Sequence, residues 1–468
     1  MTNLKYTPEE PIAAIATALA PGALGIVRCS GKNCIELLSK IFSRPKALLE
    51  AQGNTIVYGW ILAMHDDECK MTKLDEVLVS VFRGPKSFTG EDMVEISCHG
   101  GVHVVQAVFN LLLKSGFRRA EKGEFTFRAY INGKTDLTKA EAVREIIDSK
   151  TDESQSRAAG RLAGNLYETI DGVKKHIVDT LAAIEVEIEY PEDEETIADS
   201  FDASELEKAK ASLTELRDSW KSEKIYQDGA RVVLCGRTNA GKSSLFNALL
   251  KEDRAIVSDI EGTTRDFIES WIDFDGIPAR LFDTAGLRET SDVIEAVGVE
   301  RTRDLSDEAD LILYLVDSKN GINDEDKVFI REHTLESAKK IPLILVWNKC
   351  ELTEGNFASL NDADIPQVRI SAKKGMGLGD LSEAVRKSLS VAEKSERNST
   401  GLGSERQKVA VEKALESVNH ALSLTEDYAL DAVVQDLEDA LDFLGEITGD
   451  VTPEDVLDSI FSHFCVGK

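Results

Sequence analysis

Residues 236–243, near the middle of the chain, have the spacing of a phosphate-binding loop. They read Gly-Arg-Thr-Asn-Ala-Gly-Lys-Ser and lie between an apolar run at 232–235 and a helical pattern that begins at residue 244. In such a loop the glycines let backbone N–H groups wrap around phosphate oxygens, the lysine neutralises the outer phosphates, and the serine hydroxyl binds Mg²⁺. The residues predicted to bind the nucleotide here are Gly236, Asn239, Ala240, Gly241, Lys242, Ser243 and Ser244, with Ser243 as a Mg²⁺ ligand.

Two further motifs follow in the order that a nucleotide-dependent switch requires. The first motif, Gly-Thr-Thr-Arg-Asp at 262–266, supplies Thr264 as a second hydroxyl ligand for Mg²⁺. The second motif, Asp-Thr-Ala-Gly at 283–286, follows the apolar pair 281–282, so Asp283 should end a strand and contact Mg²⁺ through a water molecule. The backbone N–H of Gly286 should then lie where it can bind a γ-phosphate. The residues assigned to these two motifs are Gly262, Thr263, Thr264, Asp283, Thr284, Ala285 and Gly286.

Two loops are predicted to recognise the base, because each follows a buried-strand pattern. Residues 348–351 read Asn-Lys-Cys-Glu and residues 371–373 read Ser-Ala-Lys, and both resemble the guanine-specificity loops of translation-factor-related GTPases. The pattern in that class is Asn-Lys-x-Asp, whereas Glu351 stands at the acidic position. Its carboxylate can still accept both guanine N–H bonds if the backbone retreats by about one methylene, so we predict a weakened preference for guanine. The residues assigned to the base are Asn348, Lys349, Glu351, Ser371, Ala372 and Lys373.

The residue after Asp-Thr-Ala-Gly is Leu287, at a position where small signalling GTPases carry a glutamine that orients the attacking water. An apolar side chain cannot do this, so another side chain, a cation or a partner must assist hydrolysis. Asn239 could coordinate a monovalent cation that offsets the charge of the transition state. The alternative, from the residues alone, is that Asn239 only stabilises its loop.

The elements that position these motifs can be predicted from composition and hydrophobic periodicity, which change along the chain. Up to about residue 120, short apolar runs alternate with Gly-rich turns, which predicts strands. Ala-rich periodic spacing then predicts long helices from about residue 125 to 222. Residues 231–385 alternate buried-strand runs with helices, which predicts a parallel sheet covered on both faces. A helical periodicity returns after a linker at 393–403, so the simplest organisation is an α/β domain inserted into a helical domain.

We therefore predict a multidomain fold with four segments. An α+β domain occupies residues 1–122, and a discontinuous helical domain occupies 123–223 and 387–468. An inserted α/β P-loop GTPase domain of the Ras-like type occupies 224–386.

Composition excludes several classes of protein. The chain has 468 residues, of which 42% are hydrophobic, enough for cores of several domains. Its 55 basic and 84 acidic residues give a net charge of −29, so any contact with RNA must be local or delegated to a basic partner. No apolar run is long enough to span a membrane, and the seven scattered cysteines indicate no disulfide framework. A cytoplasmic location is expected.

Several motifs along the whole chain resemble the MnmE family, also called TrmE, of GTPases that modify tRNA uridines. The motifs lie at 12–17, 25–28, 87–92, 99–101, 123–126, 128–129, 132–134 and 136–137, and the chain ends in Phe-Cys-Val-Gly-Lys at 464–468. Three positions depart from the family pattern: Lys122 replaces a proline, Val466 replaces isoleucine, and Glu351 replaces aspartate.

The resemblance implies a homodimer, joined through N-terminal domains, that works with the flavoprotein MnmG in a heterotetramer. This complex would add an aminomethyl or carboxymethylaminomethyl group to C5 of the wobble uridine, U34, of certain tRNAs, with the tRNA held mainly by the partner. The one-carbon unit would come from a tetrahydrofolate derivative, in the 5-formyl or 5,10-methylene form. Carried over by motif, the N-terminal domain would bind it through Arg28, Glu95, Lys134 and Lys468.

The resemblance also implies potassium-stimulated hydrolysis of GTP. Asn239, Ser258, Ile260 and Thr263 would hold the K⁺, and Ser258 would also line the nucleotide site. Glu295 would orient the attacking water, although an exposed carboxylate without such a role is the alternative. Cys465 would lie near the folate as a candidate catalytic residue, whereas a cysteine between two apolar residues is ordinarily buried and inert.

Two other functions compete with this one. The chain could be a regulatory or ribosome-assembly GTPase without one-carbon chemistry. It could also be a folate-dependent aminomethyl transferase in which the GTPase domain acts only as a gate. Substitution of Arg28, Glu95 or Lys468 discriminates the tRNA-modifying GTPase from the regulatory GTPase, because in the tRNA-modifying enzyme each substitution should abolish wobble modification and leave GTP hydrolysis intact.

Overall fold

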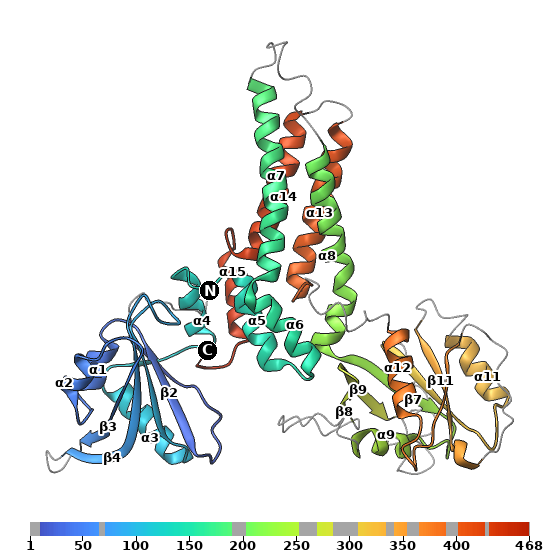
Figure 1. The fold of residues 1–468 in the computed structure, drawn as a ribbon, viewed down its shortest axis with the longest axis horizontal. Helices are drawn as coiled ribbons and strands as arrows, with labels where there is room; N and C mark the ends of the chain where they lie inside the picture. The colour runs from blue at the N-terminus through green and yellow to red at the C-terminus, as the bar shows by residue number, and fades with distance from the viewer. Residues whose placement is uncertain are drawn as a thin grey trace. The chain divides into compact units, whose positions relative to one another are not determined.

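A computed structural model describes residues 10–64, 71–189, 203–251, 269–283, 308–333, 341–352, 365–389, 401–425 and 430–467. The chain forms two compact units, one of Met1–Arg144 with Leu441–Lys468 and the other of Glu145–Ala440 (Figure 1). The first unit thus joins both ends of the sequence. None of the described helices is both long and apolar enough to cross a membrane.

The first unit contains a six-stranded sheet in the order β3-β4-β5-β2-β1-β6. Neighbouring strands are antiparallel except β1 and β6, which are parallel. The strands are β1 (Ile12–Ile15), β2 (Leu24–Ser30), β3 (Thr55–Met64), β4 (Met71–Phe82), β5 (Met93–His99) and β6 (Arg118–Arg119). The apolar runs at 26–31 and 77–82 lie in β2 and β4 and at their ends, which confirms the prediction of an α+β domain.

Alternating side chains divide this sheet into two faces, as the period of a strand requires. One face packs Val27, Val79 and Ile96 against α1 (Cys34–Ser39) and α3 (Val102–Lys114). On the other face α4 (Glu124–Ile131) places Phe125 against Ile12 and Met93. This unit also contains α2 (Pro45–Leu49) and α15 (Glu454–Ser462).

The C-terminal segment packs into this first unit. Phe461 and Phe464 form a small apolar cluster with Leu137 and Ala140 at the start of α5 (Leu137–Asp148). Val466 makes an antiparallel bridge with Lys122, just before α4. The last residues therefore lie against the N-terminal sheet.

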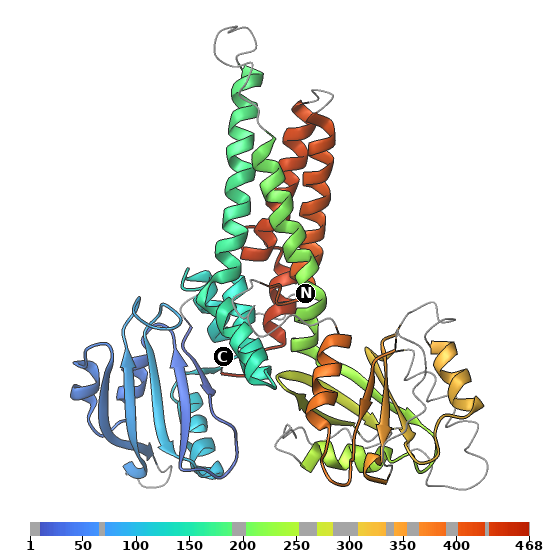
Figure 2. The same ribbon diagram turned by 45° about the vertical axis from the view of Figure 1, so that its right-hand side comes forward.

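The helical part of the second unit is discontinuous in sequence, as predicted. α8, from before the inserted domain, contacts both α7 and α13, and α13 comes after that domain. Figures 1 and 2 show these three helices running side by side. The helices are α6 (Asp152–Ala163), α7 (Asn165–Glu189), α8 (Ser204–Asp228), α13 (Glu405–Thr425) and α14 (Leu430–Thr448), which continues into the first unit.

The inserted domain has a six-stranded sheet in the order β12-β11-β10-β7-β9-β8. All neighbours are parallel except β8 and β9, which form an antiparallel hairpin through Asp275 and Gly276. The strands are β7 (Ala230–Gly236), β8 (Glu269–Phe274), β9 (Ile277–Asp283), β10 (Leu311–Asp317), β11 (Leu343–Asn348) and β12 (Gln367–Arg369).

Both faces of this sheet are covered, as the continuous apolar strands predicted. Residues such as Leu234 and Leu313 pack with α9 (Lys242–Lys251) and α12 (Leu378–Ser388). Their neighbours in sequence, Cys235 and Tyr314, pack on the other face with α11 (Asp324–Arg331). Polar residues that end the parallel strands consequently meet along one edge of the sheet.

Candidate functional site

The phosphate-binding loop connects the end of β7 to the start of α9. Gly236 and Gly241 have φ angles of +132° and +100°, which side chains other than glycine rarely adopt. A Cβ at Gly236 would lie 2.3 Å from the carbonyl oxygen of Leu315, and one at Gly241 would lie 2.1 Å from Nδ2 of Asn348. The buried Lys242 donates hydrogen bonds from Nζ to the carbonyl oxygens of Gly236 (2.7 Å) and Arg237 (3.0 Å), so its ammonium lies inside the loop.

Asn348, at the end of β11, joins three of the predicted segments. Its buried side chain donates from Nδ2 to the carbonyl oxygen of Ala240 at 2.9 Å. Its Oδ1 accepts from the backbone N–H of Ala372 at 3.1 Å. The phosphate-binding loop and both base loops are thus brought together at one strand edge by a single amide side chain.

Lys349 supplies a second link between these segments. Its Nζ donates to the carbonyl oxygen of Asn239 and pairs with Asp317 at the end of β10, at 2.8 Å in each case. Burial by itself would raise the pKa of Asp317, but hydrogen bonds from Lys349 and from the backbone N–H of Lys319 lower it overall. Asp317 therefore stays ionised and anchors the lysine of the Asn-Lys-Cys-Glu loop.

Glu351 lies in the short helix η3 (Cys350–Leu352) and faces the second base loop. A hydrogen bond from Ser371 holds the pKa of its carboxyl below the usual value. The second oxygen of this carboxylate, Oε2, is buried and has no hydrogen-bond partner among the residues that the structure describes. A buried acceptor without a donor is costly unless a ligand supplies one, and the N–H groups of guanine are suitable donors.

The predicted nucleotide residues in the described part of the chain gather at this edge. Ser243 and Ser244 are exposed at the start of α9, Asp283 ends β9, and Lys373 is exposed in the loop after β12. Asn239 has a left-handed backbone with φ of 65° and an exposed side chain. The remaining candidates lie outside the described residues: Ser258, Ile260, Gly262, Thr263, Thr264, Thr284, Ala285, Gly286, Leu287 and Glu295.

A second candidate site lies on the N-terminal sheet, around two residues that face each other across β2 and β5. Arg28 and Glu95 are register partners, and the guanidinium Nε and Nη2 lie 2.9 and 2.8 Å from Oε1 of Glu95. Both side chains are about one quarter or less exposed, at 21% and 24%. Nη1 of Arg28 also donates to the carbonyl oxygen of Gly467 at 3.1 Å, so the residue before Lys468 reaches this pair, although Lys468 itself is outside the described residues.

The loop between β4 and β5 borders the same pair. The guanidinium carbon of Arg28 lies 5.8 Å from the ring centroid of Phe88 in this loop and 5.7 Å from that of Phe125 in α4. Lys134 donates from Nζ to the carbonyl oxygen of Pro85, at the start of the same loop, at 3.0 Å. The loop thus touches two of the predicted folate residues, and the sequence pattern alone did not identify Phe88 or Phe125 as their neighbours.

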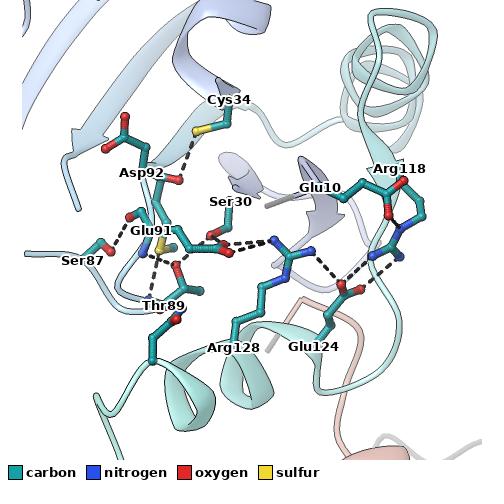
Figure 3. A network of polar contacts seen from close by, with 12 residues as sticks. Glu10, Ser30, Cys34, Ser87, Thr89, Glu91, Asp92, Arg118, Glu124 and Arg128 are labelled. Carbon is teal, nitrogen blue, oxygen red and sulfur yellow. Dashed lines mark hydrogen bonds and ion pairs between the residues drawn. The ribbon is translucent and has the colours of Figure 1, made fainter. Parts of the chain in front are cut away.

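A chain of ion pairs, buried at Arg128 and Glu124, leads away from this loop, as Figure 3 shows. Arg128 is fully buried and lies between Glu91 of the loop (3.0 Å) and Glu124 of α4 (2.9 Å). Glu124 also pairs with Arg118, which in turn pairs with Glu10 at 2.7 Å. Removing one partner of such a buried pair leaves an uncompensated charge and costs about 3–5 kcal/mol. The i,i+4 spacing of Glu124 and Arg128 was a detectable signal for one of these pairs.

Cys465 differs from the simplest expectation for a cysteine between apolar neighbours. The side chains of Cys465 and Val466 are exposed, whereas Phe464 is buried. The interpretation of Cys465 as a buried, inert side chain is therefore wrong, because the chain end lies along the sheet with only some of its side chains inward. Its thiol is open to a ligand, which leaves its candidate catalytic role as a prediction.

Comparisons with known proteins cover nearly the whole chain. A family model described as the MnmE helical domain matches residues 137–465, and one described as the GTP-binding protein TrmE N-terminus matches residues 11–134. A tRNA modification GTPase MnmE from Treponema denticola is 53% identical over 481 residues, with 99% of each chain covered. Proteins of the same description from Borrelia recurrentis and Carboxydothermus hydrogenoformans are 41% and 42% identical, with at least 98% of each chain covered.

Solved structures match only part of the chain. A crystal structure of an Aquifex aeolicus Era variant bound to GDP and AlF4⁻ is 25% identical, covers 40% of this chain and 66% of its own, and has a TM-score of 0.29. The G domain of the T. maritima FeoB iron transporter is 27% identical, covers 34% of this chain and 97% of its own, and has a TM-score of 0.24. Both scores are below 0.5, so neither likeness adds to the description of the fold.

Proposed function

Because this chain belongs to the MnmE family, whose full-length relatives are tRNA modification GTPases, we propose that it hydrolyses GTP to drive the modification of the wobble uridine of certain tRNAs. The observation that carries the GTPase half is the convergence on Asn348, which bonds Ala240 of the phosphate-binding loop and Ala372 of the base loop. Oε2 of Glu351, which is buried and has no partner in the described part of the chain, supports guanine as the base.

In this proposal different described residues bind the phosphates, the Mg²⁺ and the K⁺. Backbone N–H groups of the loop and the start of α9 bind the phosphates, and Lys242 leaves the carbonyls of Gly236 and Arg237 to neutralise them. Ser243 is exposed where it can contribute a hydroxyl to Mg²⁺, which, when bound, offsets the charge that develops on the phosphates. The exposed side chain of Asn239 is the described part of the proposed K⁺ site.

We further propose that the Arg28–Glu95 pair is the centre of a folate site. A tetrahydrofolate derivative would supply the one-carbon unit that the modification needs. The partly exposed carboxylate of Glu95 can accept hydrogen bonds from the N–H groups of a pterin ring. Arg28 can donate hydrogen bonds to the carbonyl of the ring or to the acidic tail of the folate. The contact of Arg28 with Gly467 supports a role for the C-terminal residues Cys465 and Lys468 in the same site.

An uncovered apolar face supports a homodimer formed through the N-terminal unit. Ile56, Tyr58 and Leu78 lie on the face of β3 and β4 opposite α3 and are 66%, 48% and 47% exposed. Such a patch is typical of an interface, and a second copy of this chain is the proposed occupant. The net charge of −29 favours a basic partner, the flavoprotein MnmG in this proposal, as the main holder of tRNA.

Analysis of tRNA nucleosides from a deletion strain tests the proposed function. We expect the modified wobble uridines to disappear and to return when the wild-type chain is restored. A chain carrying Gly241→Val, which cannot accommodate a Cβ beside Asn348, should fail to restore them. Normal wobble nucleosides in the deletion strain would instead favour a regulatory or ribosome-assembly GTPase.

A further inference from the structure

The position of the Arg28 guanidinium depends on the spacing between two separate elements. Its carbon lies 5.8 Å from the ring of Phe88 and 5.7 Å from the ring of Phe125. Phe88 belongs to the loop between β4 and β5, and Phe125 belongs to α4. Any shift of this loop relative to α4 would therefore change the surroundings of Arg28.

Arg128 is the residue that ties this loop to α4 (Figure 3). Its Nη1 lies 3.0 and 3.3 Å from the two carboxylate oxygens of Glu91 in the loop, and its Nη2 lies 2.9 Å from Oε1 of Glu124. Oε2 of Glu91 also accepts a hydrogen bond from Ser30 Oγ at 2.7 Å. Since Ser30 ends β2, the strand that carries Arg28, the same carboxylate joins the loop to that strand as well.

The burial of Arg128 determines what kind of role it can have. The side chain is 0% exposed, so it cannot touch a ligand bound over the partly exposed Arg28–Glu95 pair. Without Arg128, Glu124 would still pair with Arg118, whereas the largely buried Glu91 would lose its ion pair. The loop that carries Glu91 would then move toward water. A lysine keeps the charge but lacks the two forked nitrogens that reach both carboxylates.

We propose that Arg128 is a positioning residue of the N-terminal ligand site: it sets the distance between Phe88 and Phe125 and thereby the orientation of Arg28. This inference rests on the proposed folate site and adds a buried residue that does not contact the ligand but positions the residues that do. The ligand of this site is a reduced pterin with an acidic tail.

The test compares Arg128→Lys with Arg118→Lys in the full-length chain. Arg118 belongs to the same network but pairs with Glu124 and Glu10 and not with the loop, so it is the matched control. The dissociation constant of 5-formyl-tetrahydrofolate, measured by calorimetry, should rise about tenfold or more for Arg128→Lys, because a small misplacement of a binding group has a large effect. It should stay within about twofold for Arg118→Lys, and GTP hydrolysis should be unchanged in both.

Limited trypsin digestion reports on the loop itself, because general destabilisation accelerates cleavage at every site, whereas a released loop accelerates cleavage at Lys86 relative to the other sites. Lys86 lies in the loop, and its cleavage, followed by mass spectrometry, should accelerate in Arg128→Lys and not in Arg118→Lys. If Arg128→Lys does not fold, Glu91→Gln removes the charge on the loop side only, and the same two effects are expected. Equal folate affinity and equal cleavage at Lys86 in wild type and variant would overturn the inference.

The outcome for the wild-type chain separates this inference from the proposed function. If the wild type binds no folate derivative, the proposed site fails, whereas cleavage at Lys86 still reports whether Arg128 holds the loop. If the wild type binds and Arg128→Lys binds equally well, only the positioning role of Arg128 fails.

Discussion

The guanidinium of Arg28 donates a hydrogen bond to the carbonyl oxygen of Gly467, 439 positions later in the sequence. The same guanidinium pairs with Glu95 on the adjacent strand. One arginine therefore connects the N-terminal sheet to the last residues of the chain, and a ligand over the Arg28–Glu95 pair would lie beside the exposed Cys465 segment.

Replacing Arg28 should separate the two activities of the protein. In Arg28→Ala the carboxylate of Glu95 loses its cation and the chain end loses its hydrogen bond, so we expect binding of 5-formyl-tetrahydrofolate to weaken about a hundredfold or more. Modified wobble nucleosides should be lost, and GTP turnover should remain. Arg44→Ala is a suitable control, because this exposed arginine of the same unit bonds only the carbonyl of Tyr58 among the contacts described for its side chain. Unchanged folate binding in Arg28→Ala would rule out the pair as the site.

Hydrolysis of GTP should depend on the identity of the monovalent cation. We expect turnover to be about tenfold or more faster in K⁺ than in Na⁺, because a cation of fitting size stabilises transition-state charge. Asn239→Gly should abolish the difference, and glycine is the appropriate substitute since residue 239 has a positive φ that alanine would strain. Asn239→Asp keeps a side-chain oxygen and should preserve some stimulation. Equal rates in both salts for the wild type would leave Asn239 as a loop-stabilising residue only.

Glu351 should determine the choice of base. In Glu351→Gln an amide N–H replaces one acceptor oxygen, which suits the C2 carbonyl of xanthine better than the amino group of guanine. Binding of fluorescent GTP should weaken and binding of the matching XTP analogue should strengthen, each by about tenfold. Glu383→Gln, an exposed change on α12 at a residue that pairs with Lys387, is the control. Unaltered discrimination between the two nucleotides would place the base elsewhere.

The stability of the N-terminal unit should depend on pH through Glu124. Burial by itself would raise the pKa of this carboxyl, but hydrogen bonds from Arg118 and the backbone N–H of Glu121, with the charge of Arg128, lower it overall. A lowered pKa in the folded state means that the stabilisation is present above the unfolded value of about 4.5 and is lost as pH falls through the folded value.

Thermal unfolding of wild type and Glu124→Gln across a pH series measures this contribution. The difference between their melting temperatures should be constant between pH 6 and pH 8. It should shrink below about pH 4.5, where the carboxyl of the unfolded wild-type chain takes up a proton while that of the folded chain stays ionised. A difference that stays constant into acid would show that the charge of Glu124 does not stabilise the folded state.

Much of the nucleotide site could be predicted from local sequence. The glycine spacing at 236–241 specifies a turn that only glycine can make, and polar residues such as Asn348 follow apolar runs that can only be buried strands. Asp317 was missed, although it too ends a buried strand, because no loop motif marks it. Its pairing with Lys349 depends on the order of β10 and β11 in the sheet.

The sequence by itself determined the periodicities, the turns and the order of the motifs, since each depends on residues within a few positions of one another. The tertiary structure alone decided which distant groups meet: Arg28 with Gly467, Asn348 with both Ala240 and Ala372, and Arg128 with Glu91. These contacts arise from strand order and from the packing of α4 on the sheet, and the energy of a buried charge depends on neighbours that no local pattern can specify.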